Sequence, residues 1–294
     1  MEQYFNAVLI FEEVNLRQES VLISLDRLER AEATYAFGSF SKVELLNAEV
    51  DLRNDSTDLI DSRLRYENSI KVLNNVIGID PGTEYDVDRI VEYEEYLDLG
   101  ILLDEALQRN SNYLISRAQL TQSELDIKLA RSNYFPSLDL QAGYAYNNSA
   151  FDANFLESQR NNGWNTGVTL SYNIFNGGQT RRAEQNAKIQ MESSQVRIDQ
   201  TENQLKTDIL TSFNTFETNK DLLALNIRNL ELAEANYSRS QEAYAVGEIT
   251  GLQLREAQLN LLSSKFTVSQ LSVQTKASEI NLYYLSGTLV DRAP

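Results

Sequence analysis

The sequence predicts a mainly α-helical protein of long antiparallel coiled-coil hairpins in two structural repeats, with one transmembrane β-hairpin between them. Three observations support this prediction: the scarcity of helix breakers, an internal repeat, and a short region in which apolar residues alternate. Only 12 glycines and 3 prolines occur in 294 residues. Such a composition favours long, uninterrupted helices over many short elements.

The charge and the residue types exclude several classes of function. The formal net charge is -17 at pH 7, whereas nucleic-acid phosphates are bound by clustered Lys and Arg, so we expect no nucleic-acid partner. The chain has no cysteine and no histidine, which removes thiolate chemistry, the usual zinc sites and the commonest proton-transfer residue. We therefore expect no enzymatic activity, no metal and no cofactor.

Two further features limit how the chain could meet a membrane or a metal. No apolar run approaches the about 20 residues of a transmembrane helix, so a membrane crossing would have to use strands. The acidic residues Glu92, Glu94 and Glu95 are expected to form a solvated surface and not a metal site.

An internal repeat organises the chain. The segment YAFGSFSKVELLNAEVDL begins at Tyr35, and YAVGEITGLQLREAQLNL begins 209 residues later, at Tyr244. The alignment continues without a gap to Gly78 and Gly287. Each copy is typical of a helix, a tight turn and a second helix.

Turn and cap signals divide each copy. Gly38 and Gly247 are predicted to end the first helix in the left-handed conformation. A capping box, in which the side chains of the N-cap and N3 residues bond each other's backbone N–H, then opens the second helix. The two boxes are Ser41 with Glu44, and Thr250 with Gln253.

Seven-residue spacing follows each capping box and indicates coiled-coil packing. Because the connections are only a few residues long, the paired helices are expected to be antiparallel. No Pro or Gly interrupts residues 179–246, a stretch that would form a rod of roughly 100 Å if helical throughout. The rows are Leu45, Leu52, Leu59, Tyr66 and Leu73; Leu254, Leu261, Val268, Thr275 and Leu282; Ala257, Ser264, Leu271, Ser278 and Leu285; and Ile209, Phe216, Leu223, Leu230, Tyr237 and Tyr244.

The alternating region lies between the repeats and predicts two strands. One apolar and aromatic face opposite a small polar face suits a membrane hairpin with lipid outside and water inside; a half-buried hairpin on a soluble core is the alternative. The polar segment with Asn147, Asn148, Ser149, Asn161, Asn162 and Gly163 is predicted to join the strands. The predicted lipid-facing residues are Leu138, Leu140, Tyr144, Tyr146, Val168, Leu170, Tyr172 and Ile174.

These signals divide the chain into five parts. Residues 1–78 form the first helical hairpin, 79–133 a connecting segment with short helices, 134–177 the β-hairpin, 178–287 the second hairpin, and 288–294 the tail.

Several passages together resemble the TolC-like outer-membrane efflux protein family. They are DEALQRNSNY followed by a helix and YFPSLDLQ, the passage YNIFNGGQTRRAE, and the two YAxG turns. The resemblance covers nearly the whole chain. It implies a homotrimer in the outer membrane of a Gram-negative bacterium, with four strands per protomer in one shared barrel and paired helices in a periplasmic tunnel. It also implies a periplasmic adaptor protein and an inner-membrane transporter as partners.

The function implied by the resemblance is a passive exit duct of a tripartite efflux or type I secretion system, gated by untwisting of the helices at the two turns. The alternative is a soluble structural coiled-coil scaffold. An enzyme using carboxylate pairs is disfavoured, because the acids are dispersed along helices without a phosphate loop or nucleophile motif. Relative to the family pattern, strands of the first repeat would lie upstream of Met1, so we expect an N-terminally truncated chain that supplies two strands instead of four.

The resemblance also assigns candidate site residues. The tunnel constriction falls on Gln253 and Glu256, and contacts that lock the hairpins together fall on Glu44 and Ile249. Glu44 and Gln253 are also the capping-box partners, which is the alternative role for both. Glu256 and the net charge suggest a preference for cations. The candidate adaptor-contact turns comprise Gly38, Ser39 and Phe40, and Gly247, Glu248 and Ile249.

Overall fold

A computed structural model describes residues 2–37, 41–83, 85, 87, 91–150 and 158–292. The described part is mainly helical, as the sequence predicts. The chain divides into two compact units, Met1–Ala106 with Lys206–Pro294, and Leu107–Leu205. In chain order the elements are α1 (Glu2–Ala36), α2 (Lys42–Ile77), α3 (Leu99–Arg109), α4 (Ser111–Ser132), β1 (Ser137–Ala150), β2 (Ser158–Ser171), α5 (Gln179–Ala245) and α6 (Gly251–Ser286).

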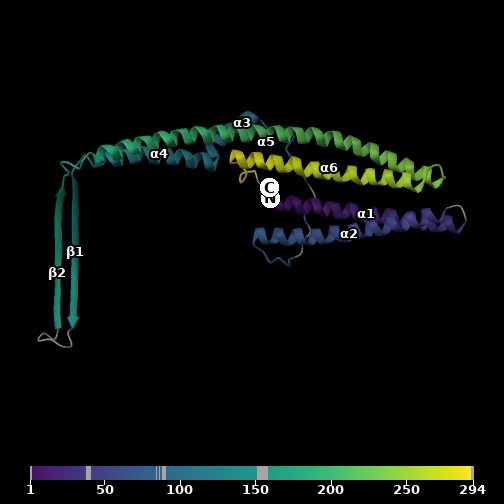
Figure 1. The fold of residues 1–294 in the computed structure, drawn as a ribbon, viewed down its shortest axis with the longest axis horizontal. Helices are drawn as coiled ribbons and strands as arrows, with labels where there is room; N and C mark the ends of the chain where they lie inside the picture. The colour runs from purple at the N-terminus through teal and green to yellow at the C-terminus, as the bar shows by residue number, and fades with distance from the viewer. Residues whose placement is uncertain are drawn as a thin grey trace. The chain divides into compact units, whose positions relative to one another are not determined.

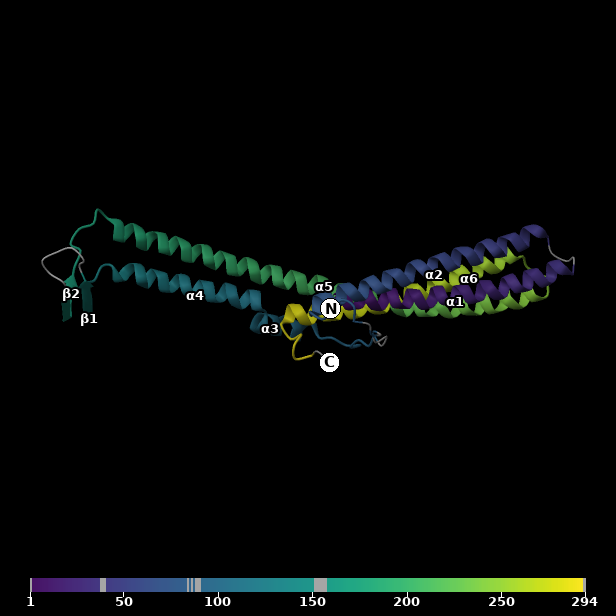
Figure 2. The same cartoon turned by 90° about the horizontal axis from the view of Figure 1, so that it is seen from below.

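The first unit contains the two predicted helical hairpins. Hairpin one is α1 with α2, and hairpin two is the later part of α5 with α6 (Figure 1). Helix α1 lies beside both α2 and α6 (Figures 1 and 2). Both predicted capping boxes are present at the starts of α2 and α6. The aligned glycines Gly78 and Gly287 end these helices with φ of 77° and 74°, a conformation that glycine adopts without steric cost.

Apolar clusters hold the helices of this unit together. One joins residues near the start of α1 to the end of α2 and to Val273 of α6. The other lies near the turn of hairpin two and consists of Ala233, Tyr237, Leu254, Ala257 and Leu261. The predicted row on α5 is largely buried, with Ile209, Phe216, Leu223 and Tyr237 all below one tenth exposed.

Helix α2 buries a second row beside the predicted one, of which Leu73 is itself buried. Leu45, Leu52 and Leu59 are only half-buried. The buried row has the same seven-residue spacing but small or polar side chains: Ala48, Asp55, Ser62 and Ser69. Small side chains let neighbouring helices approach closely, so the core of hairpin one is partly polar.

The second unit contains α4, the first part of α5 and the β-hairpin. Helix α4 lies along α5 (Figures 1 and 2) through small polar contacts, including Ser123 Oγ to Ser194 Oγ at 2.8 Å. Arg131 of α4 also pairs with Glu184 of α5 at 3.0 Å. No helix in the described residues combines the length and apolar character needed to cross a membrane.

Strands β1 and β2 pair antiparallel from Ser137↔Ser171 to Ala150↔Ser158. This register corrects the predicted strand ends. The residues expected in the connection, Asn147, Asn148, Ser149, Asn161, Asn162 and Gly163, all lie within the ladder, because backbone pairing does not require the alternation on which the prediction depended. Conversely, Tyr172 and Ile174 lie beyond the end of β2.

Candidate functional site

The turn of hairpin two is a tight, exposed loop. The Glu248 N–H donates to the Ala243 carbonyl at 2.9 Å, and the Gly247 N–H donates to the Tyr244 carbonyl at 3.0 Å. Gly247 has φ 81°, as its predicted capping role requires. Glu248 is exposed and Ile249 is half-buried. The corresponding residues of the first turn, Gly38, Ser39 and Phe40, lie outside the described residues.

Two of the candidate constriction and lock residues are the N3 partners in the capping boxes. Glu44 accepts the Ser41 N–H at 3.3 Å. Gln253 accepts the Thr250 N–H at 2.8 Å. The capping role predicted as their alternative is therefore confirmed, and it leaves open a second role in a larger assembly.

The other two candidates differ in exposure. Glu256 is exposed, so its charge is available to solvent or to a solute. Ile249 packs against the apolar cluster that contains Leu254. Its side chain therefore contributes to the packing that anchors the turn.

Charged groups of hairpin one surround Tyr244 of hairpin two. Burial raises the pKa of the Tyr244 hydroxyl, the Arg27 charge lowers it, and the Glu44 carboxylate raises it further. Asp26, Arg27 and Arg30 of α1 line the same small pocket as Tyr244, so the charges beside this hydroxyl come from hairpin one.

The β-hairpin presents one apolar face. Because paired residues share a face, the register places Leu138 with Leu170, and Leu140 with Val168. All four side chains are between 67% and 79% exposed. The opposite face carries Asp139 paired with Thr169, Gln141 with Gly167, and Gly143 with Asn165.

Aromatic residues lie towards both ends of this face. Tyr144 pairs with Trp164, their ring centroids 5.2 Å apart. Trp164 was missed from the sequence because it falls in the stretch expected to be a loop. Counting back in steps of two from Leu170 and Val168 leads through Thr166 to Trp164, and that spacing was the signal that could have found it. At the helical end, the exposed residues Tyr134, Phe135, Tyr172, Ile174 and Phe175 surround the strand termini.

This arrangement matches what a bilayer requires of a strand pair. A continuous apolar face of this kind is unfavourable in water. Residues 138–146 form an apolar and aromatic segment of nine positions on β1, close to the about 9–11 residues that cross the hydrocarbon layer. Aromatic residues are typical of the two membrane interfaces.

Comparison with known proteins gives the same family as these features. The model of the outer membrane efflux protein family matches residues 102–288, more than half of the chain. The probable outer membrane lipoprotein SilC of Salmonella typhimurium is 22% identical over 302 residues, covering 97% of this chain and 62% of the relative. The cation efflux system protein CusC of Escherichia coli O157:H7 is 22% identical over 297 residues, with the same two coverages.

Solved structures show the fold. The outer membrane protein VceC of Vibrio cholerae superposes with a TM-score of 0.75 at 16% identity, covering 97% of this chain and 68% of that one. This chain spans 62% of the length of the two curated relatives above. The fold, the strand face and the family match agree, and the chain belongs to the outer membrane efflux protein family.

Proposed function

We propose that this chain is a subunit of an outer-membrane exit channel, a passive conduit from periplasm to exterior in a tripartite efflux or type I secretion system. The observation that carries the proposal is the exposed apolar face of the β-hairpin, whose strands join α4 and α5 within a few residues at Ser132–Ser137 and Ser171–Gln179. Such a chain places strands in lipid and helices in the adjoining aqueous space. The conduit requires no catalytic group and no cofactor.

Lipid contact falls on the apolar face defined by the register. Leu138, Leu140, Val168 and Leu170 meet the hydrocarbon, and Tyr144, Tyr146 and Trp164 meet one interface. Tyr172 and Ile174 lie beyond the strand and meet the other interface, with Phe175. The polar face with Gln141 and Thr169 then faces water in the lumen.

The edges of the hairpin support a barrel shared with further strands. Two strands leave two unpaired edges, which cannot stay unsatisfied in lipid. A homotrimer with the four strands per protomer that the family pattern implies would supply neighbouring strands for both edges. The polar seam between α4 and α5, with Ser123 its only buried side chain on α4, likewise favours helices from further copies around the same tunnel.

The turns supply the partner contacts of the proposed channel. The exposed loop at Gly247, Glu248 and Ile249, with Gly38, Ser39 and Phe40 of the first turn, would meet a periplasmic adaptor that links the channel to an inner-membrane transporter. Gln253, Glu256, Glu44 and Ile249 would narrow or lock the tunnel nearby. The name of the relative CusC, a cation efflux protein, supports cations as one class of cargo.

The test separates lipid contact from loss of folding by using both faces of the hairpin. Leu140→Asp and Val168→Asp place a carboxylate on the apolar face, whereas Gln141→Asp and Thr169→Asp place the same group on the polar face. In a Gram-negative host we expect the parent and the polar-face variants to fractionate with the outer membrane as a detergent-soluble, heat-modifiable trimer. The apolar-face variants should be depleted from that fraction, because a charged side chain that faces hydrocarbon is unfavourable.

The opposite result would favour the soluble scaffold. Extraction of the parent protein without detergent, with all four variants behaving alike, would contradict the channel proposal.

A further inference from the structure

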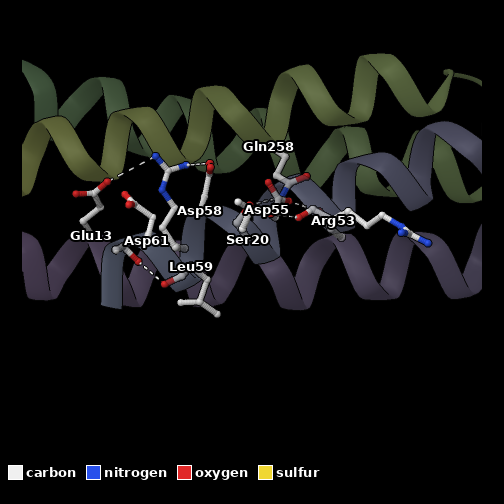
Figure 3. A network of polar contacts seen from close by, with 12 residues as sticks. Glu13, Ser20, Arg53, Asp55, Asp58, Leu59, Asp61 and Gln258 are labelled. Carbon is white, nitrogen blue, oxygen red and sulfur yellow. Dashed lines mark hydrogen bonds and ion pairs between the residues drawn. The ribbon is translucent and has the colours of Figure 1, made fainter. Parts of the chain in front are cut away.

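A buried charged cluster joins the two helical hairpins, and Figure 3 shows Ser20, Asp55 and Gln258 within it. Arg255 of α6 donates two hydrogen bonds to Asp55 of α2, from Nη1 to Oδ2 at 2.7 Å and from Nη2 to Oδ1 at 2.6 Å. Ser24 of α1 donates to the same carboxylate. Gln258 accepts from Arg255 at 3.1 Å and donates to Ser20 at 3.3 Å. Asp55, Ser20, Ser24 and Gln258 are each at most 3% exposed.

Stability alone does not account for charges in this position. Removing a carboxylate and a guanidinium from water has a large desolvation penalty, and well-packed apolar side chains of similar volume often serve as well or better. Buried polar groups are best attested where they fix the register or the partner of packed helices. The surrounding residues show why these hairpins need such a group.

The buried row on α2 defines its own register poorly. Ala48, Ser62 and Ser69 are small and similar in shape, so displacing the neighbouring helix by seven residues would keep much of the packing. Asp55 is the only charged member of the row. A displacement by seven residues along α6 would bring Leu262 to the place of Arg255, leaving Asp55 without the guanidinium that it bonds.

The internal repeat raises a second ambiguity, because the hairpins resemble each other. The position equivalent to Asp55 in the second repeat is Ser264, and the position equivalent to Arg255 in the first repeat is Leu46. If hairpin one packed against a second hairpin one, Asp55 would meet Leu46. If hairpin two packed against a second hairpin two, Arg255 would meet Ser264. Each mispairing buries a charge without its partner, which is strongly unfavourable.

We propose that the Asp55–Arg255 pair is the recognition element by which hairpin one selects hairpin two, in a single register, over a displaced register or a second copy of itself. Ser24 and Gln258 orient the two charged groups. The proposal concerns assembly of the hairpins and stands whether or not the protein conducts solutes.

A cross-linking experiment measures the register directly. The chain has no cysteine, and Glu19 of α1 meets Lys265 of α6 at 2.7 Å on the outside of the same interface. In the native register, a short bifunctional thiol reagent should cross-link Glu19→Cys to Lys265→Cys. Glu19→Cys with Ser272→Cys reports a displacement by seven residues. The protein is unfolded, refolded in detergent and cross-linked.

A second cross-linking experiment, on a mixture of two single-cysteine chains, measures whether hairpin one packs on another hairpin one. One chain carries Glu19→Cys alone and the other Ser56→Cys alone, because Ser56 is the repeat equivalent of Lys265. A product that joins the two chains reports hairpin one packed on hairpin one.

The parent background should give the native product at least about tenfold over both mispaired products, because each of them leaves a buried charge unpaired. The double variant Asp55→Ser with Arg255→Leu, which takes both side chains from the equivalent repeat positions, should keep its helix content while mispaired products rise to a comparable yield. Exchange of the charges, Asp55→Arg with Arg255→Asp, should restore the native product.

A matched control removes an exposed carboxylate–guanidinium pair on α2. Glu49→Gln with Arg53→Gln neutralises charges that lie 42% and 78% exposed on α2, and it should leave the product ratio unchanged. The proposal is overturned if the Asp55→Ser, Arg255→Leu chain retains the native ratio, if exchanging the charges fails to restore it, or if the double variant does not fold.

Discussion

At the scale of single residues, the neighbours of Asp55 stabilise the charged form of its carboxyl group. Burial by itself would raise the pKa of the Asp55 carboxyl, but hydrogen bonds from Arg255 and Ser24, and the charge of Arg255, lower it below the ordinary value. A carboxyl whose pKa is lowered by folding stabilises the folded state above its ordinary pKa of about 4. That stabilisation is lost as the pH falls through the lowered pKa.

We predict that Asp55→Asn lowers the free energy of unfolding by about 3 kcal/mol near neutral pH, because Arg255 is left without its counter-charge in a buried site. The variant should also lose less stability than the parent between about pH 5 and pH 2. Urea unfolding followed by circular dichroism at several pH values measures both effects. Asp61→Asn, at an exposed pair with Arg65, is the control and should follow the parent.

Gln253 combines a confirmed capping contact with an untested place in the tunnel, and two substitutions separate these roles. Gln253→Glu keeps the capping box and should leave the melting temperature close to that of the parent, because Glu is an equivalent partner at this position. Gln253→Ala removes the hydrogen bond from the Thr250 N–H and should lower the free energy of unfolding by about 0.5–1 kcal/mol. Thermal unfolding checks both, and equal melting temperatures for the two variants would contradict the capping role.

At the scale of elements, the helices were predictable because their signals are local. The caps at Ser41 and Thr250 and the glycine at 247 depend on a few neighbouring residues, and all three take their predicted geometry. Burial on α2 was not predictable in the same way, since it depends on which helices pack there. The leucine row lies beside the buried one, three positions away, and does not show that Asp55 is buried. The Asp55 contact with Arg255 spans 200 residues.

For the strands, the sequence predicted the apolar face but not where each strand ends. Alternation identified the face with Leu140 and Val168, yet it gave strand ends that the register corrects by several residues on both sides. Asn147 and Asn161 pair through their backbones, and a side-chain pattern does not predict such pairing. Trp164 was left out of the predicted strand for the same reason, although it lies on the same face as Tyr144.

Trp164 is the single tryptophan of the chain, so its fluorescence reports the β-hairpin alone. We predict that transfer from detergent into lipid vesicles keeps its emission blue-shifted, and that lipids brominated near the headgroup quench it more than lipids brominated near the bilayer centre, because aromatic residues concentrate at the interface. The control moves the indole to the polar face with Trp164→Tyr and Asn165→Trp. If lipid bromines quench this variant as strongly as the parent protein, the two faces do not differ in their contact with lipid.

At the scale of the whole molecule, the charge is strongly one-sided. The chain has 43 acidic and 26 basic residues, and three copies in one channel would multiply that imbalance. A water-filled passage lined by one sign of charge concentrates counter-ions and repels co-ions over about a Debye length, near 10 Å at 0.1 M salt. An exposed carboxylate at a narrow point therefore has more influence on ion passage than one on the outer surface.

We predict that the protein in planar bilayers conducts with a preference for cations, seen as a reversal potential displaced towards the cation equilibrium potential in a potassium chloride gradient. Glu256→Gln should reduce that displacement, and the reduction should shrink as salt is raised because screening weakens the field of the carboxylate. Glu49→Gln removes the same charge from a residue paired with Arg53 on α2 and should have little effect. Both variants change the net charge equally, so a smaller reversal-potential displacement in Glu256→Gln alone would show that the position of the carboxylate determines selectivity. Anion preference in the parent protein would contradict an acidic constriction.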